Sequence, residues 1–259
     1  MKFQTRNTIV LGSVLACALL ATGCSGGGGI GGESDFSNVK TETELFPYSG
    51  QNLTIDAGSS ELVITSGDVD GVEVSRQVTG TANGESPAVV QSLDGDQLSL
   101  SIDCNGFSLG CDAKFSVTVP SNVAVTATNK KSQIDATNMS ADLTVAAVGG
   151  DAILKNISSP NLTLTGKDMT VTSEDLSSKS VSSDTRNGDI DLAFAGVPDQ
   201  VEVNSHDGNV RLSLPNAEYR VSVATKKGNE EVSVSKSDSS EHLITVTTRN
   251  GDVTIAPAP

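Results

Sequence analysis

Residues 181–214 read VSSDTRNGDIDLAFAGVPDQVEVNSHDGNVRLSL and contain one short turn pattern twice. Arg186-Asn187-Gly188-Asp189-Ile190 is followed by His206-Asp207-Gly208-Asn209-Val210, and Arg249-Asn250-Gly251-Asp252-Val253 repeats the pattern near the C-terminus. Lys227-Gly228-Asn229 occupies an equivalent place between the last two. These turns start about 20 residues apart, a spacing that is typical of solenoid repeats.

A second marker shares this register. Val119-Pro120-Ser121-Asn122-Val123, Val197-Pro198-Asp199-Gln200-Val201 and Leu214-Pro215-Asn216-Ala217 each place a proline after one apolar segment and before another. Proline cannot donate a hydrogen bond within a sheet, so it favours the ends of strands. One repeat unit therefore reads as a strand, a proline corner, a second strand and a Gly/Asn/Asp corner.

Apolar residues alternate with polar residues over most of the chain. This period of two places aliphatic side chains on one face of a strand and polar side chains on the other. We therefore predict an all-β domain with strands at Leu53/Ile55, Leu62/Ile64, Val72/Val74, Leu98/Leu100/Ile102, Phe115/Val117/Val119, Val123/Val125, Leu143/Val145, Leu162/Leu164, Met169/Val171, Ile190/Leu192, Val201/Val203, Val210/Leu212/Leu214, Val221/Val223, Val232/Val234, Ile244/Val246 and Val253/Ile255.

Two architectures can use these strands. Asn-Gly turns between alternating segments are ordinarily a hairpin signal, which would give an antiparallel β-sandwich. Alternatively, each unit is one rung of a parallel β-helix, and its strands stack on the equivalent strands of the next rung. The repetition of both corner types favours the β-helix, and so does a core without Trp. We expect a single-domain β-helix with rungs of about 20 residues.

The repeated V-x-V-x-(S/T)…(N/D)-G-(D/N)-(V/I) units resemble the adhesin-type β-strand-repeat domain of bacterial envelope proteins. The resemblance covers residues 53–255 and is best in residues 179–255. It implies a right-handed parallel β-helix in a lipoprotein or membrane-linked protein. The family has no established catalytic residues, so the resemblance assigns none here.

The N-terminus has the order of a secretory signal peptide. Lys2 and Arg6 precede the apolar residues 9–20, and small residues lead to Cys24. The segment resembles a bacterial lipoprotein signal, although Ala21 stands where Leu is commoner; an ordinary cleaved signal is the alternative. The resemblance implies that residues 1–23 are removed and that Cys24 carries lipid. We expect residues 24–35 to be a flexible Gly-rich tether and residues 36–259 to be the folded domain.

The remaining cysteines are close in sequence. Cys17 lies in the signal segment, which leaves Cys104 and Cys111 in the domain. Outside the cytoplasm such a pair favours a disulfide. A redox pair more often reads C-x-x-C, and two thiols alone do not form a zinc site. We therefore predict a structural disulfide between Cys104 and Cys111.

The net charge limits the partners of this chain. It contains 17 Lys and Arg against 32 Asp and Glu, which gives a formal charge of −15 at pH 7. An acidic surface disfavours nucleic acid and anionic lipid headgroups, because phosphate contacts need basic side chains. The expected partners are the membrane, through the lipid anchor, and a protein or glycan ligand at the cell surface. A well-solvated surface also explains the charge.

Acidic turns are the only candidate metal sites. Gly67-Asp68-Val69-Asp70-Gly71 and Asp94-Gly95-Asp96 offer carboxylate oxygens to calcium. They lack the acidic run and closing Glu of an EF-hand, and they do not match the nonapeptide of calcium-binding β-helices. Turn chemistry accounts for the same residues. We therefore expect no metal site and no cofactor.

The sequence also lacks a recognisable catalytic motif. No G-x-S-x-G, H-E-x-x-H or phosphate loop is present. Asp189, Asp191, Arg186 and Arg211 would have to converge across rungs to form an acid–base site. We predict a non-catalytic, lipid-anchored protein of the cell envelope, with surface binding or scaffolding as its role. The alternative is a carbohydrate-active β-helix enzyme, a polysaccharide lyase or hydrolase.

Overall fold

The computed structural model describes residues 35–259, which form twenty β-strands. Among these residues, no helical segment has the length and hydropathy needed to cross a bilayer. The strands are β1 (Glu42–Pro47), β2 (Asn52–Asp56), β3 (Glu61–Gly67), β4 (Gly71–Ala82), β5 (Ala88–Asp94), β6 (Gln97–Asp103), β7 (Ser108–Pro120), β8 (Ala124–Asn129), β9 (Ile134–Thr137), β10 (Leu143–Lys155), β11 (Asn161–Leu176), β12 (Ser180–Asn187), β13 (Ile190–Phe194), β14 (Gln200–Asp207), β15 (Val210–Leu214), β16 (Glu218–Lys227), β17 (Glu230–Val232), β18 (Ser235–Lys236), β19 (Leu243–Asn250) and β20 (Val253–Pro257).

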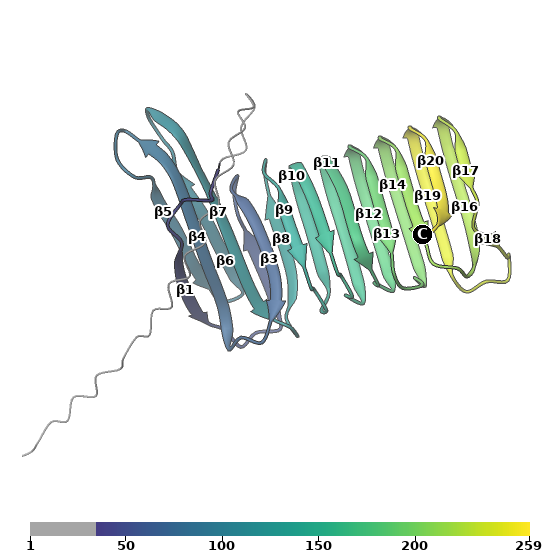
Figure 1. Ribbon diagram of the computed structural model, residues 1–259, viewed down its shortest axis with the longest axis horizontal. Helices are drawn as coiled ribbons and strands as arrows, with labels where there is room; N and C mark the ends of the chain where they lie inside the picture. Colours follow the sequence, from purple (N-terminus) through teal and green to yellow (C-terminus); the bar gives the residue numbers. More distant parts are fainter. Residues whose placement is uncertain (1–34) are drawn as a thin grey trace, which may run out of the picture. The chain divides into compact units, whose positions relative to one another are not determined.

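Most strands pair in parallel with the equivalent strand of a neighbouring rung (Figure 1). A first stack runs β6, β2, β8, the start of β10, the start of β11, β12, β14, β19 and β16. A second stack runs β7, β3, β9, the end of β10, the end of β11, β13, β15, β20 and β17. The all-β expectation is confirmed, and the antiparallel sandwich is wrong for these strands because their pairing is parallel.

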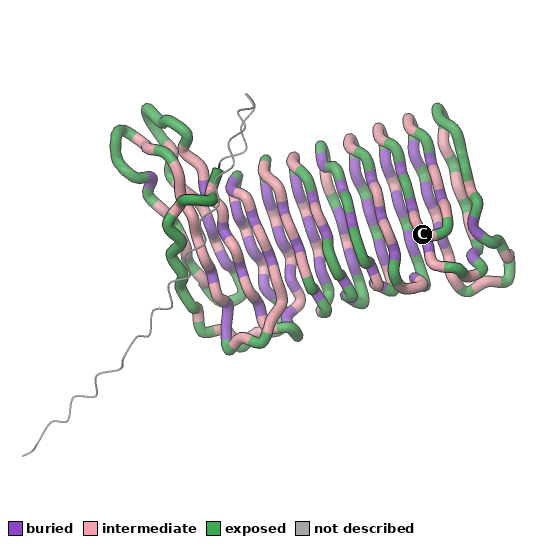
Figure 2. The backbone as a smooth tube through the Cα atoms, in the orientation of Figure 1, coloured by how far each residue is buried: buried purple, intermediate pink, exposed green. Residues whose placement is uncertain are grey.

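The core consists of columns of aliphatic side chains that cross the rungs. In the first stack Leu143, Leu162, Val181, Val201 and Ile244 are successive register partners, and each is buried. Buried and exposed positions alternate along the strands, as the period of two predicts (Figure 2). Each column thus removes a continuous line of apolar surface from water, which no single rung can do.

The order of the rungs differs from their order in the sequence. The turn spacing predicted that each rung would stack on the one before it. Instead β19 and β20 lie between the rung of β14 and β15 and the rung of β16 and β17 (Figure 1). In the sequence, the strands of the outer rung, β16 and β17, therefore come before those of the inner rung, β19 and β20.

The N-terminal part departs from the parallel pattern. β4 pairs antiparallel with β1 and β7, and β5 pairs antiparallel with β6. Asp94-Gly95-Asp96 lies at the β5–β6 hairpin turn, and residues 67–71 connect β3 to β4. These acidic turns are therefore not solenoid corners.

The predicted disulfide is present at this end of the domain. Cys104 and Cys111 are bonded, with their Cα atoms 6.0 Å apart, at the connection between β6 and β7. The Asn83 side chain donates to the carbonyl of Asn105 and accepts from the amide of Phe107. The closed loop exposes 70% of Phe107.

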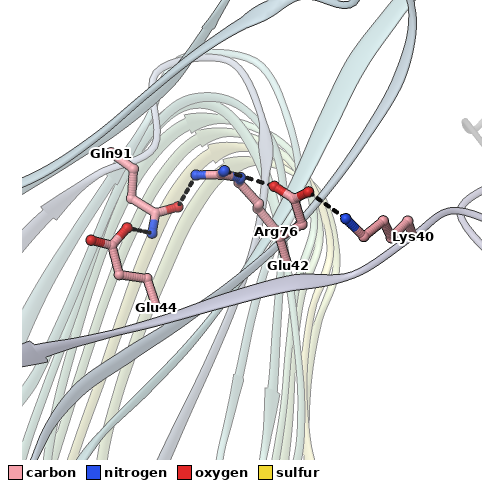
Figure 3. A network of polar contacts seen from close by, with 5 residues as sticks. All are labelled: Lys40, Glu42, Glu44, Arg76 and Gln91. Carbon is pink, nitrogen blue, oxygen red and sulfur yellow. Dashed lines mark hydrogen bonds and ion pairs between the residues drawn. The ribbon is translucent and has the colours of Figure 1, made fainter. Parts of the chain in front are cut away.

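A polar network lies where β1, β4 and β5 meet at the N-terminal end of the core (Figure 3). The Glu42 carboxylate is 2.9 Å from Lys40 Nζ and 2.7 Å from Arg76 Nη2. Arg76 also donates to Gln91, and Gln91 donates to Glu44. Glu42, Glu44 and Phe46 share one face of β1, and Phe46 packs against the core. Inward-pointing charges of this kind prevent an edge strand from pairing with another chain.

The network predicts how Glu42 titrates. Hydrogen bonds from Lys40 and then Arg76 lower the pKa of Glu42 from 4.5 to about 2. The ionised form is thus favoured in the folded state, so its stabilising contribution is complete above pH 4.5 and is lost as the pH falls through about 2. Lys40→Gln should raise this pKa, measured by NMR titration of the side-chain carboxyl, whereas Lys236→Gln should not. A wild-type midpoint near the ordinary value would contradict the network.

The corner glycines predict a large difference between two glycine substitutions. Gly208 has a φ of 156°, and an added Cβ would lie 2.1 Å from the carbonyl oxygen of Gly188 in the next rung. Gly84 also has a positive φ, 83°, but nothing lies within 4 Å of its added Cβ. Gly84→Ala should lower the free energy of unfolding by about 1 kcal/mol, and Gly208→Ala by more than about 2 kcal/mol. Urea denaturation measures both, and equal losses would refute the close approach of the rungs.

Candidate binding groove

A groove of about 900 Å³ runs across the rungs on the outward side of the first stack. Its lining residues come from the ends of β2, β8, β12 and β14 and from the middle of β10 and β11. Long basic side chains line it, together with short polar and acidic residues. These are Lys130, Lys167, Arg186 and His206 in the first group, and Asp56, Thr128, Thr165 and Asp184 in the second.

The parallel register aligns the basic side chains. Ala147, Gly166, Thr185, Ser205 and Thr248 are successive register partners, so the residues that follow them also stack. We call the resulting line the basic row; in spatial order it contains Lys130, Val148, Lys167, Arg186, His206, Arg249 and Lys226. From the rung of β8 to that of β16, every rung except that of Val148 therefore presents a basic or imidazole side chain at the same position.

His206 joins two neighbouring residues in this row. Its Nδ1 lies 2.6 Å from Asp207 Oδ2, and its Nε2 lies 2.9 Å from Arg249 Nη1. A guanidinium can only donate hydrogen bonds. In the contact with Arg249, His206 Nε2 is therefore the acceptor.

A ladder of alternating Asp and Asn lies beside the basic row. Asn187 Nδ2 donates to Asp168 Oδ1, and Asn250 Nδ2 donates to Asp207 Oδ1. In spatial order the ladder reads Asp168, Asn187, Asp207, Asn250. The hydrogen bond from Asn187 lowers the pKa of Asp168, and the hydrogen bond from Asn250 lowers the pKa of Asp207.

A second ladder on the other side of the corner has the opposite phase. The backbone amide of Asn209 donates to Asp189 Oδ1 at 2.7 Å, and the amide of Asp252 donates to Asn209 Oδ1 at 3.0 Å. Asn229 in turn donates to Asp252 from its backbone and its side chain. Both ladders alternate only because the rung of β19 and β20 lies inside that of β16 and β17. Asn187-Gly188-Asp189 and Asn250-Gly251-Asp252 thus both face Asp207-Gly208-Asn209, and the outer neighbour of Asn250-Gly251-Asp252 is Lys227-Gly228-Asn229.

The residues considered for catalysis do not form one site. Arg211 Nη1 lies 3.2 Å from Asp191 Oδ2, and both line a smaller hollow with Asp189 on the outward side of the second stack. Arg186 lines the groove of the first stack instead. Asp189 and Asp191 already accept hydrogen bonds from neighbouring rungs, so the structure gives them a role in the fold.

The two carboxylates that line the groove are far apart. Asp56, Thr128, Ala146, Thr165 and Asp184 are successive register partners. Four strand spacings separate Asp56 from Asp184, which is about 19 Å. Paired carboxylates in glycoside hydrolases lie about 5–10 Å apart. This pair is therefore too widely spaced for that chemistry.

Two further sequence expectations concern metals and the anchor. Within residues 35–259, no group of three or more His, Cys, Asp or Glu side chains is arranged to hold a metal ion. Cys24, with residues 1–23 and most of the tether, lies outside the described residues. The lipid anchor therefore stays a prediction.

Sequence reasoning missed the groove, although its signal was visible. The corner repeats begin with Arg186, His206 and Arg249, directly before the Asn or Asp of each turn. Only the stacking of equivalent positions converts this repetition into a row. The position of Lys167 in the row follows from the register of its strand with that of Arg186.

Stacked parallel rungs with a groove along one side define this protein as a β-solenoid. The chain belongs to the Toastrack DUF4097 family, whose sequence model matches residues 50–256. This confirms the expected β-strand-repeat domain. No curated protein matches the chain.

Solved structures of two bacterial proteins are similar to this chain. A candidate adhesin from Bacteroides fragilis is 13% identical with a TM-score of 0.50, over 84% of this chain and 97% of that one. A candidate adhesin from Parabacteroides merdae is 15% identical with a TM-score of 0.42, over 86% of this chain and 98% of that one. At 13% identity the similarity to the Bacteroides fragilis protein concerns the fold alone.

The Asp/Asn ladder predicts a substitution and its rescue. Asn250→Asp places a second carboxylate beside Asp207 and removes a hydrogen-bond donor, so the urea midpoint should fall and the pKa of Asp207 should rise. Combining Asp207→Asn with Asn250→Asp reverses the pair and should recover most of the lost stability. Urea denaturation of the three proteins measures this coupling. If the stability lost in the double variant equals the sum of the losses in the two single variants, the alternation does not stabilise the corner.

Proposed function

We propose that this protein is a non-catalytic, adhesin-like module of the bacterial cell envelope that binds a surface ligand along the groove of the first stack. The observation that carries this proposal is the groove itself, which crosses several rungs and presents basic side chains at equivalent positions of those rungs. A repeated surface suits recognition of an extended partner. Catalysis instead requires different groups that converge on one atom.

The wide separation of Asp56 and Asp184 also supports a non-catalytic role. The fold shared with the candidate adhesin from Bacteroides fragilis agrees with it. The carbohydrate-active alternative needs an acid–base pair, and no described pair of carboxylates in the groove has that spacing.

The proposal includes the finer features of the fold and its attachment. The solenoid is right-handed with rungs of about 20 residues, consistent with contacts between neighbouring rungs at separations of 18, 19 and 20 residues. Lipid on Cys24 holds the domain at the outer side of a membrane, and the Gly-rich residues 25–32 act as a tether.

Genetics and fractionation test this function. Deletion of the gene should reduce attachment of the bacterium to its surface ligand, and the wild-type gene should restore it. Cys24→Ser should release the protein from the membrane fraction, because it removes the lipidated thiol, and should fail to restore attachment. A deletion strain with unchanged attachment and an intact envelope would contradict the proposal.

A further inference from the structure

We infer that the basic row binds a linear anionic glycan, one whose carboxylate or sulfate groups repeat along its length. The inference rests on the proposed function and specifies its ligand. The occupant is a glycan strand that lies along the groove, across the rungs, with its charged groups against the row and its hydroxyls toward the opposite side.

The first argument is that the basic side chains of the row form few ion pairs. In the part of the chain that the structure describes, Lys130, Arg186 and Lys226 form no ion pair. Lys167 lies 3.5 Å from Asp168, and the guanidinium of Arg249 contacts only the ring of His206. A protein with a net charge of −15 thus presents Lys130, Lys167 and Arg186 on one side of its groove, and Arg249 and Lys226 continue the row beyond it.

The second argument is the chemistry of the remaining lining. Thr128, Thr165, Asp56 and Asp184 provide hydroxyl and carboxylate oxygens. Glycan hydroxyls can donate to these acceptors while the glycan's anionic groups contact the basic row. A polyanion without hydroxyl donors would meet Asp184 with no favourable contact to offset the repulsion. The mixture therefore favours an anionic sugar polymer over a simple polyanion.

The lining also disfavours other extended ligands. Among the described residues of the groove there is no Phe, Tyr or Trp. Single-stranded nucleic acids are held by stacking of bases on such side chains, and the overall negative charge opposes phosphate backbones. Apart from Gly166 and the apolar Ala146, Ala147 and Val148, the lining side chains offer charge and hydrogen bonds, which favours a ligand held mainly through those interactions.

The third argument is geometric. Neighbouring strands lie about 4.8 Å apart, so the row from β8 to β19 spans five spacings, or about 24 Å. Val148 leaves one position uncharged, which separates Lys130 from the closely spaced Lys167 and Arg186. A flexible linear chain can follow this line and reach several charges in succession, whereas a compact anion reaches only one or two.

Binding of polygalacturonate oligomers by the whole chain, purified in detergent, tests the inference by calorimetry at several salt concentrations. The probes for comparison are neutral dextran, polyphosphate and phosphatidylglycerol vesicles. Arg186→Gln with Arg249→Gln removes two charges from the row; Arg211→Gln with Arg220→Gln removes two outside it. Because the net charge changes equally, only a specific site distinguishes the two double variants.

We expect polygalacturonate to bind, more weakly as salt increases, and the row variant to weaken binding about tenfold or more, since hydrogen bonds to charged groups are lost. The control variant should bind like the wild type, and dextran should not bind. Equal weakening in both variants, no polygalacturonate binding, or a preference for polyphosphate or vesicles would each overturn the inference.

Attachment separates this inference from the function on which it rests. If the row variant restores attachment to the deletion strain as well as the wild type does, the glycan assignment fails and the adhesive function stands. If the wild-type gene does not restore attachment, the adhesive function itself fails, whatever the calorimetry shows.

Discussion

Parallel pairing between rungs places every side chain beside the side chain at the same position of the next rung, about 4.8 Å away. This one constraint governs the interior and the corners. An apolar position must be followed by another apolar position, as in the column of Leu162, Val181 and Val201. A charged side chain needs a neighbour that does not repel it and can form a hydrogen bond with it, which explains why Asp207 lies between Asn187 and Asn250. The same rule makes the corner glycines necessary, since the carbonyl of Gly188 fills the space of any side chain at Gly208.

The constraint also explains the ends of the stack, where a rung has a neighbour on one side only. At the N-terminal end the parallel pattern gives way to antiparallel strands, and Glu42, Glu44 and Arg76 form polar contacts beside the core. At the other end, within the described residues, β16 pairs with β19 along its length and with β18 only at Glu218 and Tyr219. Lys226 and Lys227 lie on this outer strand. Charged edges of this kind discourage further strands from adding to a sheet.

Much of the fold could be predicted because alternation and turn residues act locally. The strands around Ile190 and Val210 followed from their period of two, and the disulfide followed from two close cysteines. Residues 180–187 were missed because Ser183 and Thr185 point into the core with no hydrogen-bond partner among the described residues, so the strand does not alternate in polarity. The rung order was missed because it depends on contacts between distant segments. A signal for this order was nevertheless visible in the turns. Asn250-Gly251-Asp252 can pair Asn with Asp at both ends of Asp207-Gly208-Asn209, whereas Lys227-Gly228-Asn229 cannot.

The candidate site could not be predicted from composition for a related reason. A net charge of −15 indicates an acidic surface, and on that basis nucleic acid and anionic lipid headgroups were disfavoured. Net charge, however, carries no information about position, whereas stacking converts one basic residue per repeat into a continuous row. Lys167 and Arg186 are separated by one rung in sequence and by one strand spacing in space. The acidic residues that outnumber them lie outside the row: Asp56 and Asp184 line the opposite side of the groove, and others belong to the Asp/Asn ladders, where amide groups compensate them. A repeat protein can therefore have a local surface opposite in sign to its whole, and its ligands are better inferred from the register than from the total charge.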